Sequence, residues 1–307
     1  MLYTITLSPT LDRTIDVEEI IYDDVNEIID ERKRAGGRGI DVSRVIKELG
    51  GQSIAFGFIG GYNGLELEGR LINEGVLCDF TRIHDEIRSN VIIYQRKKNL
   101  QTLLSTGDPE VKSFEITALY NKIREVPAES YVVLSGTMPK GMSENFFAQV
   151  ITTLKEKGVK VILDADQDVL KKGVSAGPYL VKPNIHEFGR LIEKNITDMG
   201  DIRKEAEPYL NLVEYVVVSA GARGVIGVSK GGLYHVMPPK VKVRSSIGAG
   251  DSLVAGIVYV LSNGGTFEEA LTLGVACGTA STLNPGNNLC VKEDVDIIKK
   301  EIIIKKF

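Results

Sequence analysis

The sequence predicts an α/β fold in which a mostly parallel sheet carries helices on both faces. Short runs rich in Val and Ile alternate with amphipathic stretches, and this alternation is typical of strand–helix–strand crossovers. Hydrophobic residues make up 43% of the 307 residues and charged residues 25%, which is enough apolar material for a large core. Because no proline-rich linker, low-complexity tract or internal repeat divides the chain, we expect one domain over residues 1–307.

Four buried strands and three helices define the predicted central sheet. The strands are the Val- and Ile-rich runs at Tyr131–Ser135, Val159–Asp164, Tyr179–Lys182 and Glu214–Ser219. Amphipathic stretches that predict helices lie at about 144–157, 184–194 and 201–210. Ligands of parallel sheets collect at the carboxyl ends of the strands, which draws attention to the residues that end these runs: Ser135, Asp164, Lys182 and Ser219.

Two segments outside this alternation predict a small additional sheet. Residues 12–35 contain short β-like pieces and a charged run, Asp30–Arg34. Residues 87–106 indicate a hairpin, with strands at Val91–Gln95 and Gln101–Ser105. Together they predict a β-sheet lid inserted in the domain. Pairing of its open face with a second copy of the chain would give a homodimer.

The charge balance and the cysteine pattern exclude several classes of protein. Lys plus Arg number 37 and Asp plus Glu 41, so the formal net charge is −4 and gives no chain-wide footprint for nucleic acid. Three scattered cysteines without a C-x-x-C pair favour neither a disulfide framework nor a structural zinc site, and they favour a cytoplasmic location. No apolar run approaches ~18 residues and we recognise no secretion signal, so we expect no membrane partner.

A glycine-rich turn late in the chain is the sharpest local signal. Gly248-Ala-Gly250 follows a strand-like run, Val241–Arg244, and a helix is predicted to open near Asp251. Glycines at such a turn let backbone N–H groups converge, and the helix N-terminus adds positive potential, so the turn predicts a phosphate cradle. Asp251 is also compatible with an ordinary N-cap, and we expect the helix to keep it ionised at neutral pH. The turn matches neither a P-loop nor a dinucleotide fingerprint, because Leu253 stands where a third glycine belongs.

A second glycine cluster lies early in the chain, before another predicted helix. Gly36, Gly37 and Gly39 would let a ligand approach the backbone closely. Arg38 offers a fork of donors and Asp41 an acceptor, and both suit sugar hydroxyls. Taken alone, the cluster is equally compatible with a turn followed by a helix cap.

Taken together, these motifs resemble the ribokinase-like, or PfkB, carbohydrate kinases over essentially the whole chain. The closer similarity is to the branch of phosphofructokinase B, 1-phosphofructokinase and tagatose-6-phosphate kinase. The resemblance implies a three-layer α/β/α sandwich and an ATP-dependent kinase of a phosphorylated ketohexose: fructose 6-phosphate, fructose 1-phosphate or tagatose 6-phosphate. Six motifs in the family's order carry it, at residues 6–14, 36–39, 135–141, 182–187, 219–224 and 248–251.

The family's catalytic and sugar-binding residues have matching positions in this sequence. The resemblance implies that Asp251 is the catalytic base, and that the backbone of Gly248, Ala249 and Gly250 is an anion hole around the transferred phosphate. It implies that Arg88 and Asn90 meet the phosphate that the substrate already carries. The remaining substrate-binding positions are Asp12, Gly37, Arg38, Asp41 and Ser135.

The nucleotide-binding residues are likewise implied by the resemblance. Lys182 matches a lysine that reaches the phosphates of ATP, and Asn184 and Glu187 match an element for Mg²⁺ and phosphate, with Glu187 acting through water. A loop flanking the nucleotide and a segment bordering the adenine complete the set: Ser219, Gly221, Gly224, Ala276, Gly278 and Asn284. Gly221 and Gly224 are also compatible with a simple hairpin turn, and Asn284 with a helix end. The sequence leaves the role of a monovalent cation open.

Three departures from the family pattern leave the acceptor open. Arg38 stands where Lys is usual, Asp41 where Asn is usual, and Glu27 where this branch has Arg. A charged acceptor at position 41 favours a hydroxyl-rich partner, and Glu27 removes positive charge from the lid. Residues 32–34 either restore that charge or form a solvated face. The alternative is therefore the same chemistry on an unphosphorylated sugar, nucleoside or inositol, whereas the intact Gly-Ala-Gly-Asp turn opposes a non-catalytic regulator.

Overall fold

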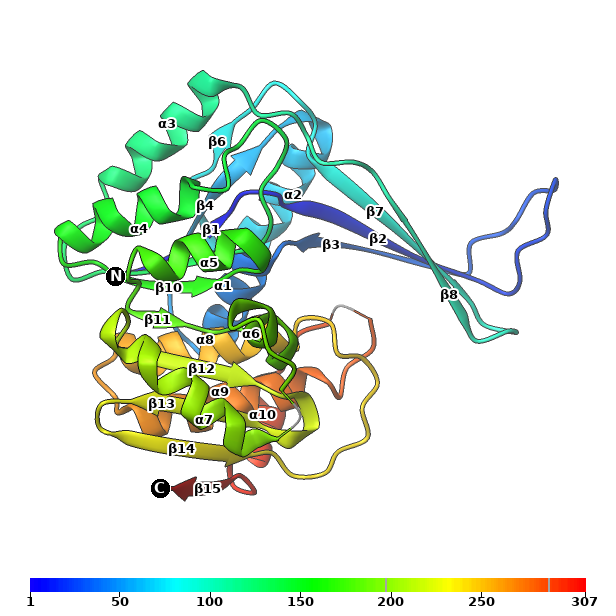
Figure 1. Cartoon of the computed structure of the whole chain (residues 1–307). Helices are drawn as coiled ribbons and strands as arrows, with labels where there is room; N and C mark the ends of the chain where they lie inside the picture. Colours follow the sequence, from blue (N-terminus) through cyan, green and yellow to red (C-terminus); the bar gives the residue numbers. More distant parts are fainter. Residues whose placement is uncertain (197, 287) are drawn as a thin grey trace.

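A large sheet of mostly parallel strands forms the body of the protein in the computed structural model, which describes residues 1–196, 198–286 and 288–307 (Figure 1). Its order is β15-β14-β13-β12-β11-β10-β9-β1-β4-β5, with β6 paired to β4. The strands from β5 to β12 in this order are parallel, and β13, β14 and β15 are antiparallel. The strands are β1 (Leu2–Thr6), β4 (Ile54–Ile59), β5 (Leu77–Cys78), β6 (Thr81–Arg82), β9 (Tyr131–Ser135), β10 (Lys160–Asp164), β11 (Leu180–Val181), β12 (Tyr215–Ser219), β13 (Val225–Ser229), β14 (Gly232–Met237) and β15 (Ile303–Lys306).

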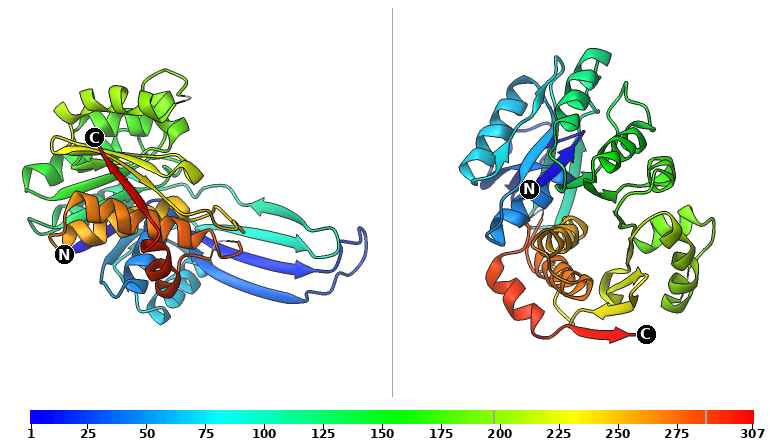
Figure 2. Two further views of the ribbon diagram at one scale, coloured as in Figure 1. Left: turned by 90° about the horizontal axis from the view of Figure 1, so that it is seen from below. Right: turned by 90° about the vertical axis from the view of Figure 1, so that its left-hand side faces the viewer.

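Two layers of helices enclose this sheet (Figure 2). Their apolar sides form separate cores on the two faces, so β1 and β9 are buried along their whole length. One face carries α3 (Ser113–Arg124), α4 (Phe146–Glu156), α5 (Gln167–Ser175), α6 (Ile185–Leu191) and α7 (Met199–Ala206). The other carries α1 (Arg38–Glu48), α2 (Gly61–Asn73), α8 (Ala249–Ser262), α9 (Phe267–Ser281) and α10 (Lys292–Lys299).

A second sheet, here called the projecting sheet, extends away from the body (Figure 1). Its order is β3-β2-β7-β8, and its strands are β2 (Thr10–Val17), β3 (Asp30–Gly36), β7 (Arg88–Gln95) and β8 (Leu100–Ser105). β2 is parallel to β7, whereas β3 and β8 run antiparallel to their neighbours. The two segments that the sequence marked as a lid thus form one four-stranded sheet.

The four strands expected at 131–135, 159–164, 179–182 and 214–219 are confirmed, with small differences at their ends. The helices expected at 144–157 and 184–194 are also present, and the third is α7 followed by a short 3-10 helix, Glu207–Asn211. The strand expected at Val241–Arg244 is wrong. β14 ends at Met237, and Pro238 and Pro239 follow, which have no N–H to donate to a sheet.

Within the described ranges, no helix has the length and apolar character that crossing a bilayer requires.

Candidate active site

The carboxyl ends of β9, β10 and β11 bring a buried charge pair to one edge of the large sheet. Ser135 is in register with Asp164, and its Oγ donates to Asp164 Oδ2 at 3.2 Å. Lys182 directly follows β11 and places Nζ 3.1 Å from Asp164 Oδ1. All three residues are buried, so Asp164 holds Lys182 in place and the Ser135 hydroxyl supports Asp164. Asp164 was not predicted as a site residue; its position at the end of a strand was the signal for it.

The glycine turn before α8 leaves that helix without a side-chain cap. Gly248 is the N-cap residue with φ 77°, and no side chain accepts from the first turn. The first N–H groups of a helix have no acceptor within the helix, so those of Gly250 and Asp251 are available to an anion, whereas the Ala249 N–H donates to the Ser246 carbonyl at 3.4 Å. A β-carbon placed on Gly250 would lie 3.8 Å from Lys182 Nζ, which puts the lysine beside the turn.

Asp251 lies in the first turn of α8, and its surroundings oppose its ionisation. Burial raises the pKa of the Asp251 carboxyl well above its usual range, and the nearby carboxylates of Asp41 and Asp164 raise it further. Arg38 and Lys182 act in the opposite direction but do not outweigh these effects. The surroundings of Asp251 therefore oppose the ionisation that the helix N-terminus was expected to favour. A carboxylate with a raised pKa is, when ionised, a stronger proton acceptor than an ordinary one.

Asp12 of β2 is held in place at the root of the projecting sheet. It lies opposite Asn90 of β7, and its Oδ1 accepts a hydrogen bond from Asn90 Nδ2 at 2.7 Å. The Thr10 hydroxyl donates to the same oxygen at 2.9 Å. Asp12 and Asn90, predicted separately, are thus direct neighbours on one face of the sheet.

The early glycine cluster brings α1 against the end of β1. Gly37 has φ 130°, and a β-carbon there would lie 2.7 Å from Thr6 Cγ2, so only glycine fits. Asp41 on the first turn of α1 places Oδ1 3.3 Å from Arg44 Nη1. Burial raises the pKa of Asp41 to about 7; Arg44 lowers it, and the charge of Asp12 raises it further.

Arg38, at the start of α1, faces the carboxylates of the large-sheet edge. Burial lowers the pKa of its guanidinium, but Asp164, Asp251 and Glu187 raise it by more. Arg38 therefore brings a positive charge to the carboxylates at this edge of the sheet, which suits a donor to a ligand placed there.

Arg88, at the start of β7, is already engaged by a carboxylate. Its Nε lies 3.2 Å from Asp108 Oδ1, and its Nη2 donates to the Ser8 carbonyl at 3.4 Å. Ser8 Oγ also donates to Asp108, which fixes the carboxylate beside the arginine. Asp108, which the sequence analysis did not single out, neutralises the charge that was predicted to hold the substrate's phosphate.

A cavity of about 490 Å³ lies beside the α8 turn, between that turn, the β12–β13 turn and α9. Four residues expected to bind the nucleotide line it, namely Ser219, Gly221, Gly224 and Gly278, together with Val225, Pro238, Val241, Val243, Leu253, Val275 and Thr279. Its lining is mostly apolar, which suits a planar base such as adenine. Gly221 and Gly224 also lie in the turn between β12 and β13. They therefore form a hairpin turn and line the cavity at the same time.

Two of the predicted nucleotide residues lie elsewhere. Ala276 is fully buried in the core between α8 and α9, and its neighbours Val275 and Thr279 line the cavity instead. Asn284 lies outside the described lining of this cavity and donates from Nδ2 to the Leu289 carbonyl at 3.0 Å. Ala276 is buried because only one side of α9 faces the cavity, whereas Asn284 lies beyond the end of α9.

Asn184 and Glu187 form the capping box of α6. Asn184 Oδ1 accepts from the His186 and Glu187 N–H groups at 2.9 Å each, and Glu187 Oε2 accepts from the Asn184 N–H at 2.7 Å. Burial raises the pKa of Glu187. Among the described residues, no three His, Cys, Asp or Glu side chains converge as a metal site made of protein ligands alone requires. This arrangement fits a Mg²⁺ that arrives on nucleotide phosphates and keeps several waters.

The chain belongs to the pfkB family of carbohydrate kinases, whose family model matches residues 5–294. It is therefore a transferase that moves a phosphoryl group to a hydroxyl acceptor, as the six motifs predicted. The 1-phosphofructokinase of Borreliella burgdorferi is 33% identical over 300 residues, covering 96% of this chain and 95% of its own. The tagatose-6-phosphate kinase of Staphylococcus epidermidis is 30% identical over 307 residues, covering 98% of both chains.

A solved structure confirms the ribokinase-like fold class. The crystal structure of phosphofructokinase-2 from Escherichia coli in complex with potassium superposes with a TM-score of 0.92 at 31% identity, covering 98% of both chains.

Proposed function

We propose that this kinase transfers the γ-phosphoryl group of ATP to a hydroxyl of a phosphorylated ketohexose. The observation that carries the proposal is the position of Asp251, a carboxyl with a raised pKa, on the uncapped first turn of α8. Asp41 and Arg38, which are expected to contact the sugar, lie close enough to Asp251 to change its pKa. Lys182, which is expected to contact the nucleotide, also changes the pKa of Asp251. The relatives named above act on fructose and tagatose phosphates, which supports that class of acceptor.

In the proposed reaction, Asp251 takes the proton of the acceptor hydroxyl as its oxygen attacks the γ-phosphorus. The bond between that phosphorus and the bridging oxygen of ATP breaks, and ADP leaves. The backbone of the Gly248–Gly250 turn and the ammonium of Lys182 stabilise charge on the transferred group. Mg²⁺ bound to the nucleotide would supply further charge neutralisation, and Asn184 and Glu187 are placed to orient its waters.

On the acceptor side, Asp12 and Asp41 offer carboxylate oxygens to sugar hydroxyls, and Asn90 keeps Asp12 aligned. A second candidate is the same transfer to an unphosphorylated polyol. The observation that favours it is the neutralisation of Arg88 by Asp108. A kinetic screen of sugar phosphates against the matching free sugars separates the two, because only the first candidate predicts a strong preference for the phosphorylated form.

The test of the mechanism is Asp251→Asn, which preserves size and the ability to accept from N–H groups. We expect kcat to fall by at least ~10²-fold with KM values for ATP and sugar near those of the wild type, because the base alone is lost. Asp201→Asn is the control, since Asp201 is an exposed aspartate in the first turn of another helix, α7. A folded Asp251→Asn enzyme with kcat within a few-fold of the control would show that Asp251 is not the base.

We also propose a homodimer closed through the projecting sheet. Leu100, Leu103 and Leu104 of β8 are exposed, as are Ile21 and Tyr22 in the segment between β2 and β3. Exposed apolar residues on an open sheet mark a surface that a second copy would cover.

A monovalent cation is a further proposal, supported by the potassium in the Escherichia coli structure, and activity in KCl compared with tetramethylammonium chloride tests it.

A further inference from the structure

The outer face of the projecting sheet, opposite the face that carries Asp12, packs against α2. In an antiparallel pair, residues directly opposite each other share a face. Arg34 is opposite Asp12, so its neighbours Lys33 and Ala35 lie on the outer face. Ala35 is fully buried there, in one apolar cluster with Leu67 of α2. The acceptor-side residues and α2 therefore lie on opposite faces of the same sheet.

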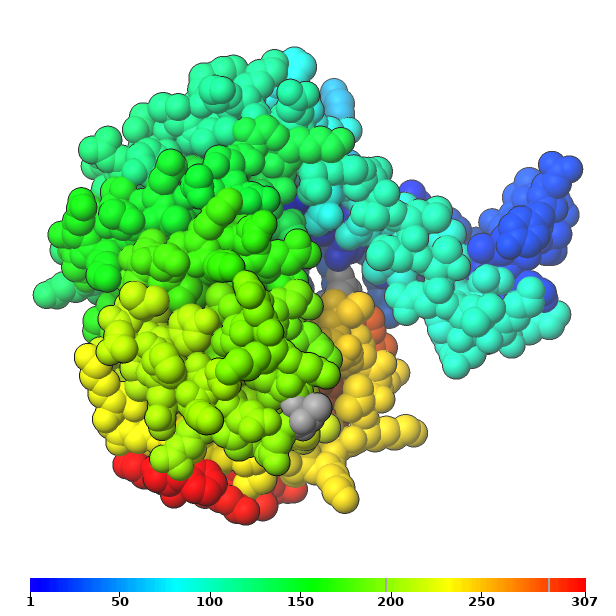
Figure 3. All heavy atoms as spheres, in the orientation of Figure 1, coloured from blue at the N-terminus to red at the C-terminus, as the bar shows by residue number. Residues whose placement is uncertain are grey.

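The inner face of the projecting sheet borders a cavity of about 570 Å³ that lies between the sheet and the body. Thr14 and Asp16, on the same face as Asp12, line this cavity from the sheet, and Pro285 and Asn288 line it from the body. Figure 3 shows the hollow below the projecting strands and beside the yellow and orange loops of the body. The position of the sheet relative to the body therefore depends strongly on the contacts of its outer face with α2.

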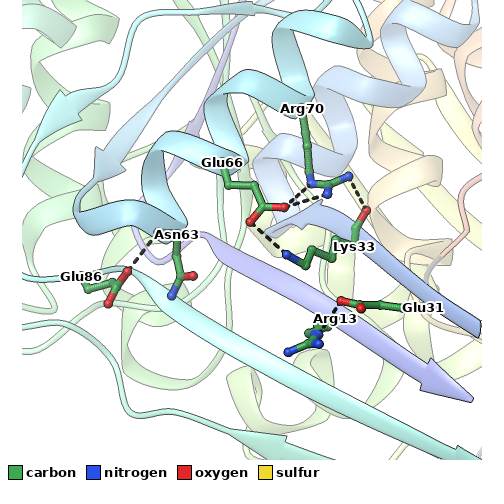
Figure 4. A network of polar contacts seen from close by, with 7 residues as sticks. All are labelled: Arg13, Glu31, Lys33, Asn63, Glu66, Arg70 and Glu86. Carbon is green, nitrogen blue, oxygen red and sulfur yellow. Dashed lines mark hydrogen bonds and ion pairs between the residues drawn. The ribbon is translucent and has the colours of Figure 1, made fainter. Parts of the chain in front are cut away.

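Glu66 joins α2 to β3 through two cations (Figure 4). Its Oε1 accepts from Arg70 Nη2 at 2.7 Å and from Arg70 Nε at 3.1 Å, and its Oε2 accepts from Lys33 Nζ at 3.3 Å. Arg70 Nη1 also donates to the Lys33 carbonyl at 3.1 Å, so the same arginine holds the backbone of β3. A single exposed ion pair contributes little, whereas a network of several charges holds its members more firmly.

The same helix also holds the segment that enters β7. The Asn63 N–H, in the first turn of α2, donates to Glu86 Oε1 at 3.0 Å (Figure 4). A carboxylate is favourable at this end of a helix. The Ile87 N–H donates to the Gly60 carbonyl at 3.2 Å, directly before β7 begins. α2 therefore contacts two separate strands of the projecting sheet, at points ~10 Å apart along its axis.

We propose that α2 positions the projecting sheet for the acceptor, with Glu66 and Arg70 as positioning residues that hold β3 from its outer face. The inference rests on the proposed function, which places the sugar at Asp12 and Asn90 on the inner face. A site that is fixed before its ligand arrives loses less conformational freedom on binding. The nucleotide cavity has no lining residue from α2, so the network acts on the affinity for the acceptor alone.

The first test compares Glu66→Gln and Arg70→Gln with Glu68→Gln and Arg82→Gln. Glu68 and Arg82 are the matched control, because they form an ion pair of 2.6 Å between the same helix and β6 of the body. We expect KM for the acceptor that the wild type prefers to rise about fivefold in the first two variants, with KM for ATP and kcat unchanged. The two control variants should match the wild type.

Three results of this test would overturn the proposal. The first is an acceptor KM that stays unchanged in either Glu66→Gln or Arg70→Gln. The second is an equal rise in all four variants, and the third is a rise in KM for ATP of the same size as that for the acceptor.

The second test reverses the ion pair between β3 and α2. Lys33→Glu and Glu66→Lys should each raise KM for the acceptor at least as much as Glu66→Gln does, because like charges then face each other. In the double variant a carboxylate at position 33 faces both Arg70 and an ammonium at position 66, so most of that rise should be recovered. The free energy of unfolding in urea is measured in parallel, because a merely structural role would make KM follow stability. A double variant with no recovery of KM, or a KM that changes only in step with stability, contradicts the positioning role.

Asp12→Asn separates failure of this inference from failure of the proposed function. Asp12 contacts the acceptor in the proposed function, so Asp12→Asn should raise KM for the acceptor independently of α2. If Asp12→Asn raises it and Glu66→Gln does not, the acceptor site stands and the positioning role is wrong. If neither variant changes it, the proposed acceptor site is wrong and the role of α2 falls with it.

Discussion

Asp41→Asn should make the protein more stable at neutral and alkaline pH. The carboxyl of Asp41 has an ordinary pKa of 3.8, and burial raises it to about 7 in the folded protein despite the neighbouring Arg44. Because the folded pKa is above the unfolded one, the native state holds a proton that the unfolded state releases, and stability falls as pH rises from about 4 to about 7. A change from 3.8 to about 7 corresponds to ~4 kcal/mol as an upper bound. We expect ~2 kcal/mol, because Arg44 also loses part of its attraction to position 41.

The measurement is the free energy of unfolding in urea at pH 4.5 and pH 8 for the wild type, Asp41→Asn and a control. Asp168→Asn is the control, since Asp168 is an exposed aspartate in the first turn of α5. The stabilisation in Asp41→Asn should be about a quarter of its full value at pH 4.5 and reach that full value at pH 8, while the control stays flat. An Asp41→Asn protein that gains equally at both pH values, or loses stability at pH 8, would refute the reasoning about burial.

Three further predictions follow from single features of the structure. Gly248→Ala should lower the free energy of unfolding by ~1–2 kcal/mol, because φ at this position is 77°, and it should also lower kcat. Gly264→Ala is the control, because its φ is 78° and the space around it is open. It should lower the free energy of unfolding without lowering kcat. Lys182→Met should destabilise the protein by ~3–5 kcal/mol in urea unfolding because Asp164 is left buried and unpaired, and adding Asp164→Asn should restore most of that loss. Leu104→Asp on β8 should halve the mass measured by light scattering from ~67 kDa, twice the 33.5 kDa chain, and a wild type that is already monomeric would remove the proposed dimer.

The parts of the fold that the sequence predicted well are those in which local pattern and burial agree. Tyr131–Ser135 was expected as a strand and is β9, because a run of five apolar or small residues has few alternatives inside a parallel sheet. The hairpin of β7 and β8 was expected because two short runs flank a polar turn. The run at Val241–Arg244 has the composition of a strand, but the preceding prolines and the end of β14 place it in a loop.

Candidate site residues could be chosen from the sequence, but their electrostatics could not. Asp251 was identified with the glycine turn that precedes it, yet its pKa depends on Asp41 and Asp164, which are distant in sequence and adjacent only in the fold. The ion pair between Arg88 and Asp108 was likewise not predictable, because Asp108 lies in a loop after β8 that carries no motif. Local patterns specify which residues reach the edge of a sheet, whereas charge balance depends on which of them meet there.

The charge of Asp41 links the stability of the protein to the pKa of Asp251. Asp41 raises the pKa of Asp251 by repulsion, so the carboxylate whose burial opposes folding at neutral pH also makes Asp251 a stronger proton acceptor. Asp41→Asn removes this repulsion, and the pKa of Asp251 should therefore fall. Since the base must be ionised to act, kcat/KM rises with pH through that pKa, and the acid limb of the profile should move to lower pH in the variant. The same variant should thus be more stable at pH 8 and less dependent on alkaline pH for activity. An acid limb that stays in place while stability rises would show that Asp41 acts on folding alone and that another group sets the basicity of Asp251.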